Sequence, residues 1–142
     1  MISRFLAALL VASVPLGAQS SDSVATQWSS SHPAYADEQA ARGEKVFQMY
    51  CASCHTTDFH TGEGFRFGWF GRTVYDLFKV LKTTMPEDNV GALSDDEYTR
   101  VIAYILKLNG FPAGSDSLRA DSLEMRRIRI GAPTDTAKVS RP

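Results

Sequence analysis

Apolar residues recur at helical spacing in three segments of the chain, and this pattern predicts the main elements of the fold. The first helix is expected from Asp37 to Cys51, because two carboxylates open it where the helix dipole favours negative charge. The apolar face of this helix is formed by Ala40, Gly43, Phe47 and Tyr50. The helix therefore runs directly into the first cysteine of the chain.

Two further helices are predicted from capping boxes, in which the first and fourth residues satisfy each other's backbone N–H groups. Residues 73–76 form one box, and apolar positions at helical spacing follow it as far as Lys82. Residues 94–97 form a second box, and the helix that it opens is closed by Asn109 and Gly110.

The remaining segments lack a helical period and are predicted to be loops or tails. Residues 56–71 contain four glycines and five aromatic residues, a composition typical of a loop wrapped around a flat ligand. Met85 precedes a proline, which favours an extended conformation between two helices. A short helix capped at Asp121 is expected after residue 115, and residues 131–142 are expected to be disordered. No pair of strands is predicted, so the expected fold class is all-α, with three main helices.

The length of the chain predicts one small domain with tails, and its charge limits what it can bind. The chain has 142 residues and a formal net charge of −1, so it is not expected to bind nucleic acid. The charge is uneven, because the end of the chain after residue 118 is basic and the part before it is acidic. The predicted segments are a signal peptide (1–20), a linker (21–34), a helical domain (35–114) and a C-terminal extension (115–142).

The first twenty residues have the pattern of a secretory signal peptide. Arg4 supplies a short basic region, an apolar run follows from Phe5 to Val14, and Ala18-Gln19-Ser20 forms a cleavage site. The apolar run is too short to span a bilayer, although a retained membrane anchor is the alternative interpretation. We therefore expect an exported protein that is periplasmic after cleavage and has no transmembrane helix.

Cys51-Ala52-Ser53-Cys54-His55 carries the chemistry of the chain. The C-x-x-C-H pattern is the attachment signature of c-type haem, and it uses both cysteines of the sequence. The two thiols can form thioethers with the porphyrin vinyl groups, and His55 then offers a neutral imidazole to the iron. The alternatives are a chance pentapeptide and a redox-active dithiol, which would need a βαβ context that the helical pattern does not provide. The sequence thus predicts one covalent haem c per chain.

A six-coordinate haem iron needs a second axial ligand, and Met85 is the best candidate among the four methionines. Met1 lies in the signal peptide, and Met125 lies in the C-terminal extension. Met49 lies two residues before Cys51, on the wrong side of the attachment. Met85 follows the motif by thirty residues, so it can reach the other face of the ring.

Three alternatives to the Met85 ligand remain. The first is that Met85 simply fills a gap in the core, as lone methionines often do. His60 is only five residues from His55, so it would need a strained loop to reach the other face of a haem. His32 lies in the predicted linker, where it is expected to be solvated.

Beyond the motif and Met85, the chain resembles class I c-type cytochromes over residues 35–114. More narrowly, it resembles the small monohaem cytochrome domains or subunits associated with periplasmic quinoprotein dehydrogenases. The residues that carry the resemblance, besides the haem motif, are Tyr35, Gln39-Ala40, Arg42-Gly43, Thr84-Met85-Pro86, Ala103-Tyr104-Ile105-Leu106 and Asn109-Gly110-Phe111-Pro112. The resemblance implies that the first and last helices cross closely, with Gly43 and Phe47 meeting Val101 and Tyr104.

These observations lead us to expect a monohaem electron carrier rather than an enzyme. The resemblance implies a periplasmic dehydrogenase as donor and an oxidase or another cytochrome as acceptor. Lys79 and Lys82 precede Met85, and Glu87 and Asp88 follow it, so a mixed-charge, transient docking surface is expected.

Two other functions remain open. One is a haem enzyme or gas sensor in which Met85 is labile. The other is a dedicated dehydrogenase subunit docked through the basic extension from Arg119 to Arg141. The alternative interpretation of that extension is a solvated tail without a docking role.

Overall fold

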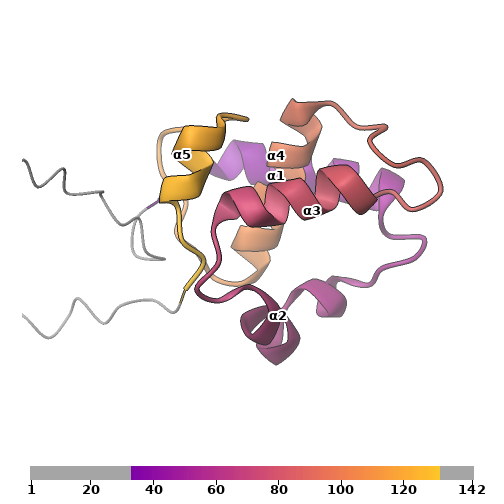
Figure 1. Cartoon of the computed structure of the whole chain (residues 1–142), viewed down its shortest axis with the longest axis horizontal. Helices are drawn as coiled ribbons and strands as arrows, with labels where there is room; N and C mark the ends of the chain where they lie inside the picture. Colours follow the sequence, from indigo (N-terminus) through magenta and orange to yellow (C-terminus); the bar gives the residue numbers. More distant parts are fainter. Residues whose placement is uncertain (1–32, 132–142) are drawn as a thin grey trace, which may run out of the picture.

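Helices account for most of the part of the chain that the computed structural model describes, which is residues 33–131 (Figure 1). The elements are α1 (Asp37–Tyr50), a 3-10 turn η1 (Thr57–His60), α2 (Gly62–Trp69), α3 (Val74–Thr84), α4 (Asp95–Leu108) and α5 (Ser122–Arg127). Residues 33–131 contain two isolated β-bridges but no strand. The expected all-α fold class is therefore confirmed. The predicted signal peptide, most of the linker and residues 132–142 lie outside the described residues.

Helices α1 and α4 pack against each other most extensively and form the centre of the fold. Gly43 makes this contact close: a Cβ atom built on it would lie 1.8 Å from the carbonyl oxygen of Arg100. Next to this crossing, the rings of Phe47 and Tyr104 lie 5.5 Å apart. The expected helix crossing is therefore present, but the group that fills the space beside Gly43 is the α4 backbone and not a side chain.

Helix α3 lies beside α4, and both helices begin at the predicted capping boxes. The Thr73 hydroxyl accepts from the Asp76 backbone N–H, and the Asp76 carboxylate accepts from the Thr73 N–H at 2.8 Å. The Ser94 hydroxyl and the Glu97 carboxylate satisfy each other's backbone N–H groups in the same way. Because both boxes are local, they fix where α3 and α4 begin without help from the rest of the chain.

The prediction that residues 56–71 form a loop is wrong for most of this segment, because η1 and α2 occupy it. Gly62 and Gly71, which bracket α2, have positive φ angles of 66° and 85°. The glycines thus make the turns at the ends of α2, and burial of Phe65 anchors the helix between them. The other aromatic residues differ: Trp69 and Phe70 are partly buried, whereas Phe59 and Phe67 are exposed.

The C-terminal extension packs onto the helical domain as far as Ile130. Leu118, Met125 and Ile130 are each at most 4% exposed and belong to the same hydrophobic cluster as α1 and α4. Gln39 on α1 is buried and bonds through its side-chain amide to both backbone groups of Leu118. The solvated-tail account is therefore wrong for this part of the extension.

Ile130, near the end of the described part of the extension, is hydrogen-bonded to the corner between α2 and α3. The Gly71 N–H donates to the Ile130 carbonyl at 2.7 Å, and the Ile130 N–H donates to the Arg72 carbonyl at 2.9 Å. The short helix α5 begins at Asp121 as predicted, since this carboxylate accepts from the Leu123 and Glu124 backbone N–H groups. Among the described residues, no helix is long and apolar enough to cross a membrane.

Candidate haem site

The end of α1 places the C-x-x-C-H motif on a single turn of chain. The Cys51 N–H still donates to the Phe47 carbonyl at 2.8 Å, as in a helix. The Cys51 carbonyl then accepts from the N–H groups of Cys54 and His55, at 3.1 and 2.9 Å. This compact turn keeps the two thiols and the imidazole close together. Partial burial raises the pKa of the Cys51 thiol above its ordinary value.

A cavity of about 1130 Å³ opens beside this turn, and it contains all four residues predicted to bind haem. Cys51, Cys54 and His55 line it from the end of α1, and Met85 lines it from the end of α3. The motif and Met85 are thirty residues apart in the sequence, so the fold has brought them to one cavity.

The rest of the cavity wall is largely apolar. Phe47 and Val101 line it where α1 and α4 cross, Phe65 and Trp69 line it from α2, and Leu77 lines it from α3. An apolar cavity with a few placed polar groups is typical of a cofactor site. Two thiols, an imidazole and a thioether are the donor set that a covalently attached, six-coordinate haem requires. The residues present therefore fit haem c.

The His55 imidazole lies among aromatic rings. Its centroid is 5.1 Å from that of Phe59 and 5.4 Å from that of His60. The His60 ring also meets the edge of Phe47, at 5.5 Å, and the Asn109 side chain donates to the His60 carbonyl at 2.8 Å. Burial, together with the nearby His55, lowers the pKa of His60.

His60 thus lies against His55 and not across the cavity from it. This position makes His60 a neighbour of the predicted ligand His55. No residue that orients His55 is predicted from the sequence. The contacts seen here come from η1, which was predicted to be an irregular loop.

Both backbone groups of Met85 are hydrogen-bonded. Its conformation is extended, as predicted, with φ −129° and ψ 151°. Its N–H donates to the Leu81 carbonyl on α3 at 2.9 Å, and its carbonyl accepts from the Tyr98 hydroxyl on α4 at 2.7 Å. This hydrogen bond is not predictable from the sequence, because no local pattern links positions 85 and 98.

Of the other methionines and histidines that the structure describes, only His60 and Met49 line the same cavity. Met49 lies on α1 just before the motif and is 72% exposed. Met125 lies on α5, is buried in the core and does not line the cavity. Met1 and His32 lie outside the described residues.

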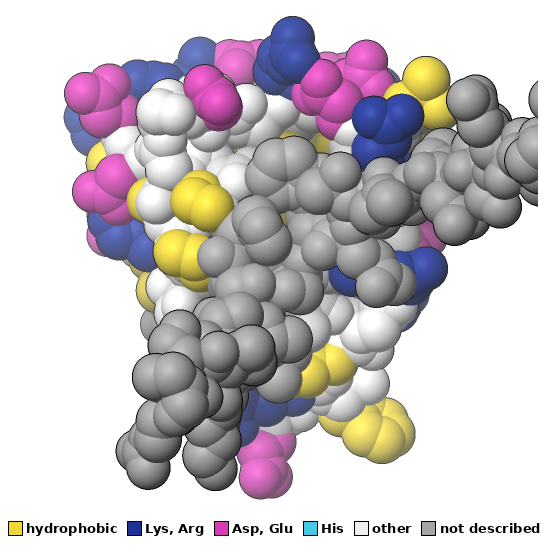
Figure 2. All heavy atoms as spheres, turned by 90° about the vertical axis from the view of Figure 1, so that its left-hand side faces the viewer, with side chains coloured by type: hydrophobic (Ala, Val, Ile, Leu, Met, Phe, Trp, Pro, Cys, Tyr) yellow, Lys and Arg dark blue, Asp and Glu magenta, His cyan; other side chains and the backbone are white. Residues whose placement is uncertain are grey.

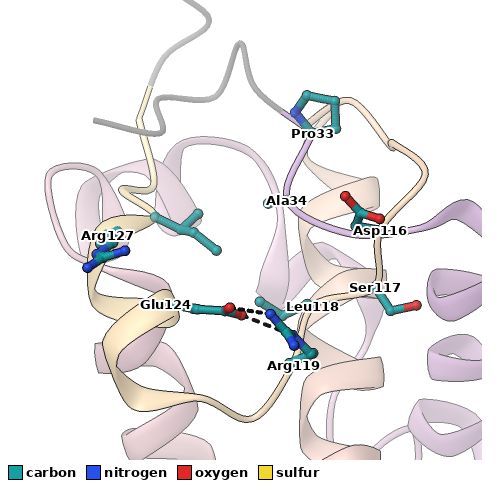
Figure 3. A pocket seen from close by; sticks show the side chains of 9 residues that line it. Pro33, Ala34, Asp116, Ser117, Leu118, Arg119, Glu124 and Arg127 are labelled. Atoms are coloured by element: carbon teal, nitrogen blue, oxygen red, sulfur yellow. Dashed lines mark hydrogen bonds and ion pairs between the residues drawn. The ribbon is translucent and has the colours of Figure 1, made fainter. Parts of the chain in front are cut away.

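A second cavity, of about 640 Å³, lies between the start of the described chain and the C-terminal extension (Figure 3). Pro33, Leu118 and Arg127 line it, and Arg119 and Glu124 form an ion pair on its wall. It contains none of the four predicted haem residues.

Residues 38–105 match a family model described as cytochrome c oxidase, cbb3-type, subunit III. No curated protein and no solved structure matches the chain. The matched segment contains the C-x-x-C-H motif, Met85, and α1 through most of α4. The match and the motif together support a c-type cytochrome domain with the small all-α cytochrome c fold and covalently bound haem c.

Proposed function

We propose that the protein is an exported monohaem c-type cytochrome that carries single electrons through a haem iron with His55 and Met85 as axial ligands. Cys51 and Cys54 attach the haem. The observation that carries the proposal is the single cavity lined by these four residues. Bound there, haem supplies reversible one-electron chemistry between Fe(II) and Fe(III).

The protein's own residues would set the conditions for that chemistry. The apolar wall around Phe65 and Leu77 excludes water and favours the less charged ferrous state. The Met85 thioether is a weak donor that raises the reduction potential. His55, held one residue after the second cysteine, has little freedom to leave the iron.

A carrier fits these features better than an enzyme or a gas sensor does. Catalysis at haem needs an open coordination position and an acid or base on the side away from the proximal histidine. His60 lines the cavity, but its ring packs against His55, so it lies on the wrong side for that role. Met85 is held by hydrogen bonds at both its N–H and its carbonyl, which favours a ligand that stays bound.

The partner is expected to present a basic surface to the cavity. Among the cavity-lining residues of the described chain, the charged ones are Asp58, Glu87 and Asp88, with no lysine or arginine. Of the two lysines that suggested a mixed surface in the sequence, Lys82 is paired with Asp95 at 2.5 Å, and neither Lys79 nor Lys82 lines the cavity. A periplasmic dehydrogenase as donor and an oxidase or another cytochrome as acceptor remain our proposal from the family resemblance.

The C-terminal extension gives no support to the alternative of a dedicated subunit docked through it. Met125 and Ile130 are used by this chain's own core, so deleting residues 119–142 would remove core side chains along with any docking segment. If such a deletion variant no longer co-purified with a dehydrogenase, the cause could be loss of the fold or loss of a docking segment, and the result would not separate the two.

Spectroelectrochemical titration of the purified haem protein tests the proposal. We expect one reversible one-electron transition and, in the ferric protein, the charge-transfer band of a thioether–iron bond. Met85→Ala should abolish the band and lower the potential, because the soft donor is lost. Met49→Ala is the matched control, since Met49 also lines the cavity, and it should leave the band unchanged. A Met85→Ala spectrum equal to that of the unaltered protein would exclude Met85 as ligand.

A further inference from the structure

Tyr98 is a buried polar residue beside the proposed haem ligand that the function has not yet used. It lies near the start of α4 and is 1% exposed. Its ring packs edge-on against Phe78 of α3, with centroids 6.2 Å apart. Its hydroxyl donates to the Met85 backbone carbonyl at 2.7 Å.

Met85 lies where α3 has ended and the chain turns towards α4. The Met85 N–H is the last to bond back into α3, through the Leu81 carbonyl. A helical carbonyl accepts from an N–H four residues later, and α3 has ended before such a residue. Among the described residues, the Met85 carbonyl accepts from the Tyr98 hydroxyl and, at 3.5 Å, from the Gly91 N–H. The Tyr98 hydroxyl is therefore the short hydrogen bond that ties the Met85 backbone to a second helix.

Helix α4 is itself a firm support for that hydroxyl. The Ser94–Glu97 capping box fixes its first turn, and the Lys82–Asp95 ion pair joins that turn to the end of α3. A side chain with three rotatable bonds, such as methionine, reaches a fixed point reliably only when its backbone is fixed.

We propose that Tyr98 is the positioning residue for Met85: its hydroxyl holds the Met85 backbone so that the thioether stays on the haem iron. This inference rests on the proposed function, because it takes Met85 as the axial ligand. Tyr98 does not touch the iron and acts only through Met85. Without its hydroxyl, the Met85 carbonyl would lose its short hydrogen bond, and the loop would more often adopt conformations with the sulfur away from the iron.

The chain offers a matched control for the loss of this hydroxyl. Tyr35 is also 1% exposed, and its hydroxyl also donates to a backbone carbonyl at 2.7 Å, that of Phe111. Tyr35 and Phe111 do not line the haem cavity. Tyr98→Phe and Tyr35→Phe thus remove the same kind of bond and keep the same ring, but only one bond belongs to Met85.

Imidazole binding to the ferric holoprotein measures how readily the thioether leaves, since imidazole must displace it. We expect Tyr98→Phe to bind imidazole about tenfold more tightly than the unaltered protein, as the loss of one buried hydrogen bond implies. Tyr35→Phe should stay within about twofold, although both variants lose similar thermal stability. Tyr98→Phe should also weaken the thioether charge-transfer band and lower the potential.

Met85→Ala separates this inference from the proposed function. If Met85→Ala binds imidazole no more tightly than the unaltered protein, Met85 is not the ligand and the proposed function fails. If Met85→Ala binds much more tightly but Tyr98→Phe matches Tyr35→Phe, the proposed function stands and the role of Tyr98 is overturned.

Discussion

At Gly43 the backbones of two helices meet with no side chain between them. The hydrogen of glycine leaves room for the Arg100 carbonyl, whose oxygen would lie 1.8 Å from a Cβ atom at this position. Real Cβ atoms do not approach an oxygen so closely, and backbone on both sides leaves no flexible group to move aside. The packing of α1 on α4 therefore depends on one residue type at position 43.

Gly43→Ala is expected to destabilise the holoprotein by about 3 kcal/mol, at the upper end of the cost of overpacking, because α1 must move away from α4. The loss should appear as a lower midpoint in urea unfolding followed by circular dichroism. Since α1 also carries the haem motif, a shift in the haem spectrum should accompany the lower stability.

Gly68→Ala provides the comparison. Gly68 lies within α2, and a Cβ atom there would have no heavy atom within 4 Å. Alanine favours the helix by up to about 1 kcal/mol over glycine, so this variant should be as stable as the parent or more so. Equal losses at positions 43 and 68 would contradict the close-approach argument.

For single residues, a role could be predicted from the sequence where a motif carries the chemistry. It could not be predicted where the role depends on a contact with a distant residue. Cys51, Cys54 and His55 are recognised from their spacing, and the expectation about Gly43 followed from the family resemblance. The contacts of Tyr98 with Met85 and of His60 with Phe47 join positions 13 residues apart, with no pattern between them. Such contacts become visible only after the chain has folded.

At the scale of elements, helices with local start signals were predictable and those without them were not. The boxes at residues 73–76 and 94–97 are each contained in four residues, and both are present in the structure. Helix α2 was missed because its glycines lower helix propensity, whereas burial of Phe65, a tertiary effect, stabilises it. The packing of the extension was missed because Gln39 and Leu118, which bond to each other, are 79 residues apart.

The two capping boxes should make stability depend on pH in the acid range. Hydrogen bonds from Thr73 lower the pKa of Asp76 below 3.8, and hydrogen bonds from Ser94 lower the pKa of Glu97 below 4.5. In each case the folded pKa is below the unfolded value, so the ionised carboxylate stabilises the fold above the unfolded pKa. The contribution is lost as the pH falls through the folded pKa, so melting temperature should decrease as the pH is lowered from about 5 towards 3.

The double variant Asp76→Asn, Glu97→Gln tests this dependence by thermal melting at several pH values. It should be less stable than the parent at neutral pH, by on the order of 1 kcal/mol for each weakened cap, and should lose less stability on acidification. Glu44→Gln with Asp116→Asn removes two exposed carboxylates outside the boxes and should leave the acid dependence steep. If the melting temperature of the double variant decreased with acid as steeply as that of the parent, groups other than Asp76 and Glu97 would govern the acid dependence.

At the scale of the whole molecule, charge is distributed differently on different faces. Figure 2 shows lysine, arginine and acidic side chains interspersed on the face that lies on the left of Figure 1. The cavity lining instead carries three carboxylates and no basic side chain among the described residues. A charged reactant should therefore sense a negative field at the cavity more than elsewhere.

Salt should slow electron exchange with cationic reagents and speed it with anionic ones. We expect reduction of the ferric protein by hexaammineruthenium(II) to slow about threefold between roughly 10 and 150 mM salt, because screening removes the attraction. Oxidation of the ferrous protein by ferricyanide should respond in the opposite direction. Stopped-flow kinetics give both rates.

Local charge can be separated from net charge with two double variants. Glu87→Gln with Asp88→Asn removes two carboxylates from the cavity lining and should flatten both salt dependences. Glu44→Gln with Asp116→Asn removes the same charge away from the cavity and should change them little. Equal effects would mean that only the net charge of the protein matters.

The position of the C-terminal extension in the core also sets an order in time. A chain is made from its N-terminus, so the two thiols of the haem motif exist long before Met125 and Ile130. The described core that surrounds α1 is incomplete without those two side chains. If the chain is exported as proposed and emerges N-terminus first, the cysteines are in reach of haem before Met125 and Ile130 can complete the described core.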